Sequence, residues 1–124
     1  MPNNHSDQRI YALQAEILRG LAHPVRLEIL HLIGTREISF SDLFQQMGIT
    51  QTMLSQHLAV MRRAGIMTAR RDGARTFYRL KYPEIEVACE AVTRVLSQHL
   101  ADLKDETGVL LRRVSSGRSQ AAKH

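Results

Sequence analysis

The segment over residues 39–64 constrains the fold more than any other, because it predicts two helices separated by a very short turn. Ser39 and Asp42 have the spacing of a capping box, with Asp in place of the usual Glu, and predict the start of a short helix. Gly48 is expected to end this helix in a left-handed conformation. Thr50 then caps a second helix that runs to about residue 64. The pattern predicts a helix-turn-helix, and an ordinary helical hairpin is the alternative.

A β-hairpin is predicted directly after these helices. Ile66–Arg71 and Arg75–Lys81 contain strand-forming residues and flank Asp72 and Gly73. An Asp-Gly pair in this setting predicts a type I′ turn, in which both central residues have positive φ. Pro83 then opens a long final helix that carries acidic residues in its first turn.

Two further helices are expected ahead of this region. Ile10, Leu13 and Ile17 recur every three or four positions, which indicates one face of a helix beginning near residue 8, with Gly20 as its stop. The next helix, over residues 24–33, is apolar on most sides and is expected at the centre of the core. The order helix, helix, helix-turn-helix, hairpin, helix predicts a mainly α chain with a β-hairpin wing, which is the winged helix-turn-helix architecture.

Length and composition set the limits of this architecture. The chain has 124 residues, enough for one domain with a single core. We expect a flexible arm over residues 1–7, the winged helix-turn-helix domain over 8–107 and a basic tail over 108–124. No apolar run approaches the ~20 residues of a membrane span, no leader opens the chain, and its one cysteine excludes an internal disulfide framework. These features predict a cytoplasmic protein with no membrane partner.

Positive charge is concentrated in one block of the chain. Residues 62–81 hold seven Lys and Arg against Asp72 alone, whereas the net charge of the whole chain is +5. Such polarity favours a polyanion on one face of the molecule. A merely solvated basic face is the alternative.

The second helix of the helix-turn-helix is expected to bury Met53, Leu54, Leu58 and Met61 and to turn a polar face outward. Amide and hydroxyl side chains near a helix N-terminus suit the major groove, where amides pair with adenine edges. Arginines on a hairpin tip can follow phosphates or enter a minor groove. The residues expected to contact DNA are Gln51, Thr52, Ser55, Gln56, Arg62, Arg70, Arg71 and Arg75.

Three stretches carry a resemblance to a known family. LAHPVRLEIL at 21–30, TMLSQHLAVMRRAGIM at 52–67 and RRDGARTFYRL at 70–80 resemble the ArsR/SmtB family of bacterial transcription regulators, over roughly residues 10–100. The resemblance places base contacts in the same helix and adds His57 to them. A packing or phosphate-positioning role is the alternative for this histidine.

The resemblance also implies a homodimer, because the family pairs its protomers through the first and last helices. Specific DNA binding by such short modules usually comes from two-fold dimers on inverted repeats. Both helices carry apolar stripes beyond what one small core needs. The interface candidates, for each of which the monomer core is the alternative, are Ile10, Leu13, Ile17, Ile85, Val92, Leu96 and Leu103.

The metal sites of the family lack their ligands here. The Cys-x-Cys site falls on Ser39 and Ser41, and the zinc site of the last helix retains only Glu84. We therefore expect no metal and no cofactor. Cys89 and His99 remain as sensor candidates, although ten helical residues separate them by about 15 Å. Structural roles are the alternative for both.

Together these patterns predict a sequence-specific, dimeric DNA-binding transcription regulator, a repressor on an inverted-repeat operator. Its expected partners are double-stranded DNA and a second copy of the chain, and a small effector or a partner protein is left open as the signal. The alternatives are a winged-helix protein-interaction module and a redox-responsive regulator that uses Cys89. The sequence contains no nucleophile motif, glycine-rich phosphate loop or His-rich zinc pattern, so it does not favour an enzyme.

Overall fold

The computed structural model describes residues 4–103 and 111–116. The chain divides into two compact units, Met1–Tyr82 and Pro83–His124, where the sequence predicts one domain over residues 8–107. Each unit is described by itself.

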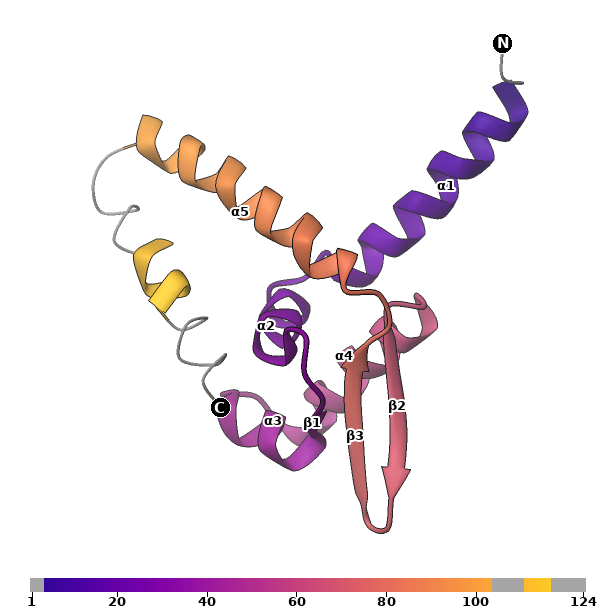
Figure 1. Cartoon of the computed structure of the whole chain (residues 1–124), viewed down its shortest axis with the longest axis vertical. Coiled ribbons are helices and arrows are strands. Elements are labelled where there is room, and N and C mark those ends of the chain that lie inside the picture. Colours follow the sequence, from indigo (N-terminus) through magenta and orange to yellow (C-terminus); the bar gives the residue numbers. More distant parts are fainter. Residues whose placement is uncertain (1–3, 104–110, 117–124) are drawn as a thin grey trace. The chain divides into compact units, whose positions relative to one another are not determined.

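The first unit contains four helices, α1 (Asn4–Leu21), α2 (Pro24–Ile33), α3 (Phe40–Gln46) and α4 (Gln51–Arg63). Figure 1 shows α2, α3 and α4 grouped beside the strands, while α1 extends away from them. Because α1 begins at Asn4, residues 4–7 of the expected arm are helical. The helix-turn-helix formed by α3 and α4 confirms the order of elements predicted from the sequence.

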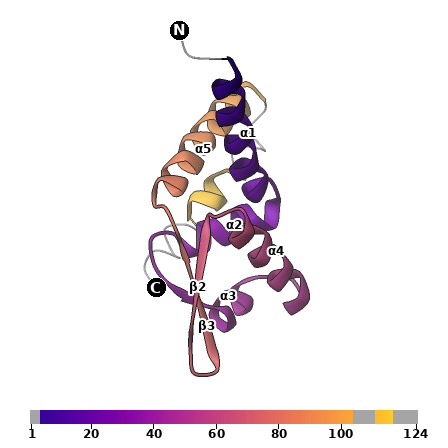
Figure 2. The same cartoon turned by 90° about the vertical axis from the view of Figure 1, so that its right-hand side faces the viewer.

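The strands of this unit form one antiparallel sheet in the order β1-β3-β2, with bounds β1 (Ile38–Ser39), β2 (Met67–Asp72) and β3 (Arg75–Leu80). The β2–β3 hairpin projects beyond the helices of its unit, as both views show (Figures 1 and 2). The short strand β1 is not expected from the sequence, where Ser39 predicts only a helix cap. Ser39 does both, since it pairs with Phe77 of β3 and its Oγ accepts a hydrogen bond from the Asp42 backbone N–H at 3.1 Å.

Two expected turn conformations are wrong. Asp72 pairs with Arg75, so the central residues of the hairpin turn are Gly73 and Ala74, and only Gly73 has a positive φ, 63°. That arrangement fits a type II′ turn, which needs positive φ at its first central residue alone, and not a type I′ turn. Gly48 does not adopt the left-handed conformation either. The residue that ends α3 is Met47, which is extended, and Gly48 has no positive φ.

The core of the first unit is formed by α2, α3, α4 and one face of the hairpin. Buried side chains on α4 recur every three or four positions, as a helix with one buried face requires. Met53, which the sequence assigns to this stripe, is 40% exposed because it lies one position before the buried row. The fully buried hydrophobic side chains are Ile29, Ile33, Leu43, Leu54, Leu58, Met61 and Ile66.

Gly20 lies inside α1 and is not the stop expected there. A Cβ built on this residue lies 2.5 Å from the Cβ of Ala64, which follows the last residue of α4. Carbon atoms prefer separations of about 3.5–4.0 Å, so only glycine lets the two helices approach this closely. The absence of a side chain at Gly20 therefore sets the spacing of α1 and α4.

The second unit consists of α5 (Glu84–Asp102), which follows Pro83, and a helical segment over residues 111–116. That segment is helical where the sequence predicts a flexible tail, and the rest of the tail lies outside the described residues. Ile85 is buried, whereas Val92, Leu96 and Leu103 are exposed. Within the described ranges, no helix is both long enough and apolar enough to cross a membrane.

Candidate nucleic-acid interface

Side-chain caps fix the start of both helices of the helix-turn-helix. Thr50 Oγ1 accepts a hydrogen bond from the Met53 backbone N–H at 3.1 Å, as Ser39 does for α3. Each cap satisfies one of the backbone donors that a helix start leaves without an intrahelical partner. The caps therefore define where α4 begins and which residues occupy its first turn.

The first turns of α4 present a polar surface. Leu54 and Leu58 anchor the opposite face of the helix in the core, and neither is exposed to solvent. This anchoring fixes the rotation of α4 about its own axis. The predicted contact residues that the structure leaves exposed on α4 are Gln51, Thr52, Ser55, Gln56 and Arg62.

His57 is half-buried and turns toward α2. Its Nδ1 lies 3.1 Å from an Nη atom of Arg26, and its ring centroid lies 4.4 Å from that of His23. Burial, followed by the nearby His23 and Arg26, lowers the pKa of His57 below its ordinary value. Of the candidate base contacts on α4, His57 is thus the one engaged inside the protein.

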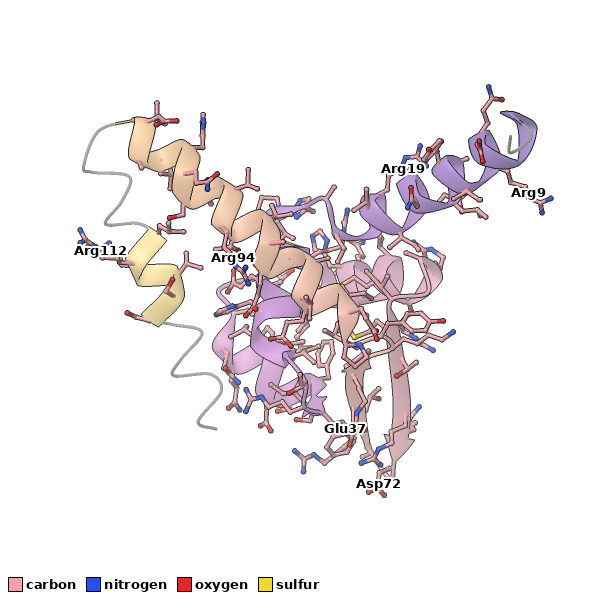
Figure 3. The ribbon with its side chains drawn as sticks, turned by 45° about the horizontal axis from the view of Figure 1, so that its top comes forward. Arg9, Arg19, Glu37, Asp72, Arg94 and Arg112 are labelled. Atoms are coloured by element: carbon pink, nitrogen blue, oxygen red, sulfur yellow. The ribbon has the colours of Figure 1, made fainter. Side chains whose placement is uncertain are left out.

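Arg70 on the hairpin is held by an acidic residue that is remote in the sequence. Its Nε and one Nη donate to the two carboxylate oxygens of Glu37 at 2.8 and 2.6 Å, a bidentate pair. The hydrogen bond from Arg70 lowers the pKa of the Glu37 carboxyl group. Figure 3 shows Glu37 beside the hairpin and Asp72 near its tip. Two of the three guanidinium nitrogens of Arg70 are therefore engaged within the protein.

Arg75 is also engaged within the unit. It donates to Ser39 Oγ at 3.2 Å and lies 3.8 Å from a carboxylate oxygen of Asp42. The guanidinium groups of Arg70 and Arg75 both lie over the ring of Phe77, at 4.6 and 5.1 Å from its centroid. These cation–π contacts lie within the hairpin, whereas the contacts of Arg75 with Ser39 and Asp42 join it to β1 and α3.

Arg71 differs from its two neighbours. It pairs with Thr76 in the hairpin, so its side chain lies on the opposite face of the ribbon from Arg70. It is exposed and makes no hydrogen bond or ion pair within the part of the chain described. Of the three arginines predicted at the tip, Arg71 is the one that has none of its donors engaged within the described residues.

The predicted dimer residues fall into two groups. Ile10, Leu13 and Ile17 of α1 are 53%, 52% and 44% exposed, and Val92 and Leu96 of α5 and Leu103 directly after it are exposed as well. Tyr11 and Leu18 extend the apolar surface of α1. Ile85 is buried in the single chain, so its side chain is not part of this exposed apolar surface.

The two sensor candidates do not form a cluster. Cys89 is half-buried, His99 is exposed, and Thr93 Oγ1 donates to the Cys89 carbonyl at 3.0 Å. Among residues 4–103 and 111–116, no three His, Cys, Asp or Glu side chains are grouped so that they could hold a metal ion.

Sequence reasoning missed Glu37, Phe77 and Arg26 as partners of the predicted contact residues. Glu37 lies 33 positions from Arg70, and Arg26 lies 31 positions from His57. No local spacing signals contacts over such distances. The alternation of side chains along β3 could have indicated that Phe77 shares a face with Arg75, because residues two apart in a strand do so.

Comparison with known proteins agrees with the winged helix-turn-helix fold. Residues 23–68 match the model of the bacterial regulatory protein family arsR. An uncharacterised HTH-type transcriptional regulator of Mycobacterium tuberculosis, Rv0081, is 42% identical over 101 residues, which cover 77% of this chain and 89% of the relative. Its crystal structure matches with a TM-score of 0.67 at 39% identity, over 75% of this chain and 94% of that one.

Two other solved structures share the fold. The transcriptional repressor BigR of Xylella fastidiosa matches with a TM-score of 0.64 at 35% identity, over 77% of this chain and 96% of its own. A homodimeric winged helix-turn-helix DNA-binding domain of Mycobacterium bovis matches with a TM-score of 0.71 at 24% identity, over 83% of this chain and 95% of its own. The fold and the similarity to the M. tuberculosis regulator agree. The chain therefore belongs to the arsR family of bacterial regulatory proteins, winged-helix transcription regulators that bind DNA and are not enzymes.

Proposed function

We propose that this chain is a homodimeric repressor that binds an inverted-repeat operator with α4 in the major groove. The observation that carries the proposal is the exposed polar surface of α4, which is held in place by a fully buried row of Leu54, Leu58 and Met61. A recognition helix needs both features, because its side chains must reach base edges from a fixed orientation.

The side chains on this surface have the donors and acceptors that base reading needs. Gln51 and Gln56 carry amides, which can pair with both hydrogen-bonding groups of an adenine edge, and Thr52 and Ser55 carry hydroxyls. Arg62, further along the exposed side, is suited to a phosphate. We assign base reading to the first two turns of α4.

The wing contributes mainly phosphate binding in this proposal, and its arginines have different roles. Arg71 has free donors for a phosphate. Arg70 and Arg75 are tied to Glu37, Ser39 and Asp42, and they fix the position of the hairpin. The net charge of residues 62–81 therefore overstates the charge that the wing offers to DNA.

Dimerisation is supported by the apolar surface that the single chain leaves uncovered. Ile10, Leu13 and Ile17 lie on one side of α1 and are exposed in the single chain. Most of the stability of a helix in a protein comes from packing its apolar face, so a second copy that covers this side would stabilise α1. Val92 and Leu96 are similarly exposed on α5. The M. bovis domain is described as homodimeric, and two copies would read two half-sites about one helical turn apart.

The decisive experiment selects duplexes from random DNA and then compares variants on the selected operator. Gln56→Ala is expected to lose roughly 1–3 kcal/mol of discrimination between the operator and a one-base mutant. Gln98→Ala, which removes the same amide from an exposed position on α5, is the matched control. Unchanged discrimination in Gln56→Ala would show that this side chain does not read bases.

A salt titration and a reporter test the rest of the proposal. Phosphate neutralisation makes duplex affinity fall steeply with salt, whereas a protein-interaction module has no such dependence. The BigR relative is named as a repressor, and we expect deletion of this chain to raise expression from a promoter that carries the operator. Lower expression after deletion would make the chain an activator.

A further inference from the structure

Arg26, which occupies the third position of α2, connects three elements of the first unit. One Nη atom donates to the backbone carbonyl of Arg19 in the last turns of α1 at 3.0 Å. The other lies 3.1 Å from Nδ1 of His57, in the middle of α4. Together with the close contact of Gly20 and Ala64, this fixes the C-terminal end of α1 against α4 at two separate points.

The chemistry of the contact determines the protonation state of the histidine. A guanidinium has only donors, so Nδ1 of His57 must be the acceptor and must carry no proton. The same holds for His23, which packs against His57. Its Nδ1 caps α2 by accepting a hydrogen bond from the Val25 backbone N–H at 3.1 Å. In this structure Nδ1 of each ring therefore carries no proton, and each ring is neutral.

The groups around His57 oppose its protonation. From the start of α2, His23 and Arg26 face the ring, and the other Nη atom of Arg26 donates to the backbone carbonyl of Arg19. Burial is the main cause of the lowered pKa of His57, with His23 and Arg26 adding to it. The contribution of this neutral pairing is complete above the ordinary histidine value of 6.5 and is lost as the pH falls through the lowered pKa.

We infer that Arg26 is a positioning residue for DNA binding, which holds the recognition helix α4 at a fixed orientation to α1 as long as His57 is neutral. The inference rests on the proposed function, in which α4 reads bases and α1 contacts the second protomer. The Arg26 bridge, meaning its two contacts to Arg19 and His57, links these two surfaces directly.

Arg26 does not have the features of a phosphate contact. Two of its three nitrogens are engaged inside the protein, and its Nε is buried without a hydrogen-bond partner in the described part of the chain. A buried donor without a partner costs stability. Arg26→Met keeps most of the aliphatic stem and removes this cost, so we expect the variant to fold.

The experiment compares Arg26→Met with Arg36→Met on the operator selected above. Arg36 is also half-buried and also donates to a backbone carbonyl, that of Leu32, but this carbonyl belongs to the adjoining helix α2 and the contact joins no second helix. We expect operator affinity to fall about tenfold or more in Arg26→Met, with the salt slope and the affinity for random duplex unchanged. An equal loss on all duplexes with a lower salt slope would make Arg26 a phosphate contact and overturn the inference.

A pH series separates positioning from general stability. Operator affinity of the unmodified chain is expected to fall below about pH 6.5, although added positive charge would by itself strengthen binding to DNA. His57→Gln keeps a side-chain acceptor for Arg26 but cannot titrate, so the operator affinity of this variant should not fall as the pH is lowered. His23→Asn keeps the helix cap and should leave the pH dependence in place. A dependence that disappears in His23→Asn and persists in His57→Gln would contradict the role of His57.

A measurement without DNA keeps this inference distinct from the proposed function. Residual dipolar couplings report the orientation of α4 relative to α1 in solution, and we expect this orientation to change in Arg26→Met and not in Arg36→Met. Unchanged couplings would overturn the inference even if the operator experiments succeed. Changed couplings in a chain that selects no operator would instead contradict the proposed function alone.

Discussion

Gly20→Ala adds a methyl group where α1 and α4 are too close to accommodate one. The new Cβ would lie 2.5 Å from the Cβ of Ala64 and 3.4 Å from Cδ1 of Ile66. Since carbon atoms prefer about 3.5–4.0 Å, the helices must separate by about 1 Å. Ile66 is buried and has little room to move.

Two effects of opposite sign decide the magnitude. Overpacking in a well-packed contact costs typically about 1–3 kcal/mol, and the 2.5 Å separation places Gly20→Ala toward the upper end of that range. Replacing a helical glycine by alanine returns about 1 kcal/mol of helix propensity. We therefore expect a net loss of about 1–2 kcal/mol in the free energy of unfolding, or roughly 4–8 °C in Tm for each kcal/mol.

Thermal and urea unfolding followed by circular dichroism measure this loss. Gly48→Ala is the matched control, because a Cβ at that position has no neighbour within 4 Å and Gly48 has no positive φ. It should be neutral or slightly stabilising. The double variant Gly20→Ala, Ala64→Gly removes the clashing methyl group and should recover part of the stability, which appears as a coupling energy in the double-mutant cycle. If Gly20→Ala is as stable as Gly48→Ala, the close approach of α1 and α4 is wrong.

Three further outcomes are expected. Arg71→Ala should weaken binding to every duplex and reduce the slope of log affinity against log salt by about 0.9, the value for one phosphate contact; an unchanged slope would exclude that contact. Sedimentation at micromolar concentration should give about twice the chain mass of 14.1 kDa, and a monomer would contradict the α1 interface. Cys89→Ser should keep DNA binding, and mild peroxide should change operator affinity little, because Cys89 is half-buried and reaction of a thiol with an oxidant requires exposure. A peroxide-dependent loss that Cys89→Ser abolishes would make the chain a redox sensor.

The amino-acid sequence determined the features that depend on neighbouring residues. Ser39 and Thr50 cap the helices they were expected to cap, and the hairpin forms around Gly73. These outcomes follow from local hydrogen bonds and backbone preferences, which a few adjacent residues specify. The periodicity of Leu54 and Leu58 likewise predicted which face of α4 is buried, because the helical repeat is a local property.

Only the tertiary structure decided which charged and polar side chains are free. The pairing of Glu37 with Arg70 and the bridge from Arg26 to His57 join residues more than 30 positions apart. The close approach at Gly20 likewise depends on how α1 crosses the end of α4. Such contacts arise from the packing of whole elements, so charge counts and helical periodicity carry no information about them. For this reason the sequence predicted three equivalent arginines on the wing, whereas the folded chain leaves Arg71 as the one with its donors unengaged.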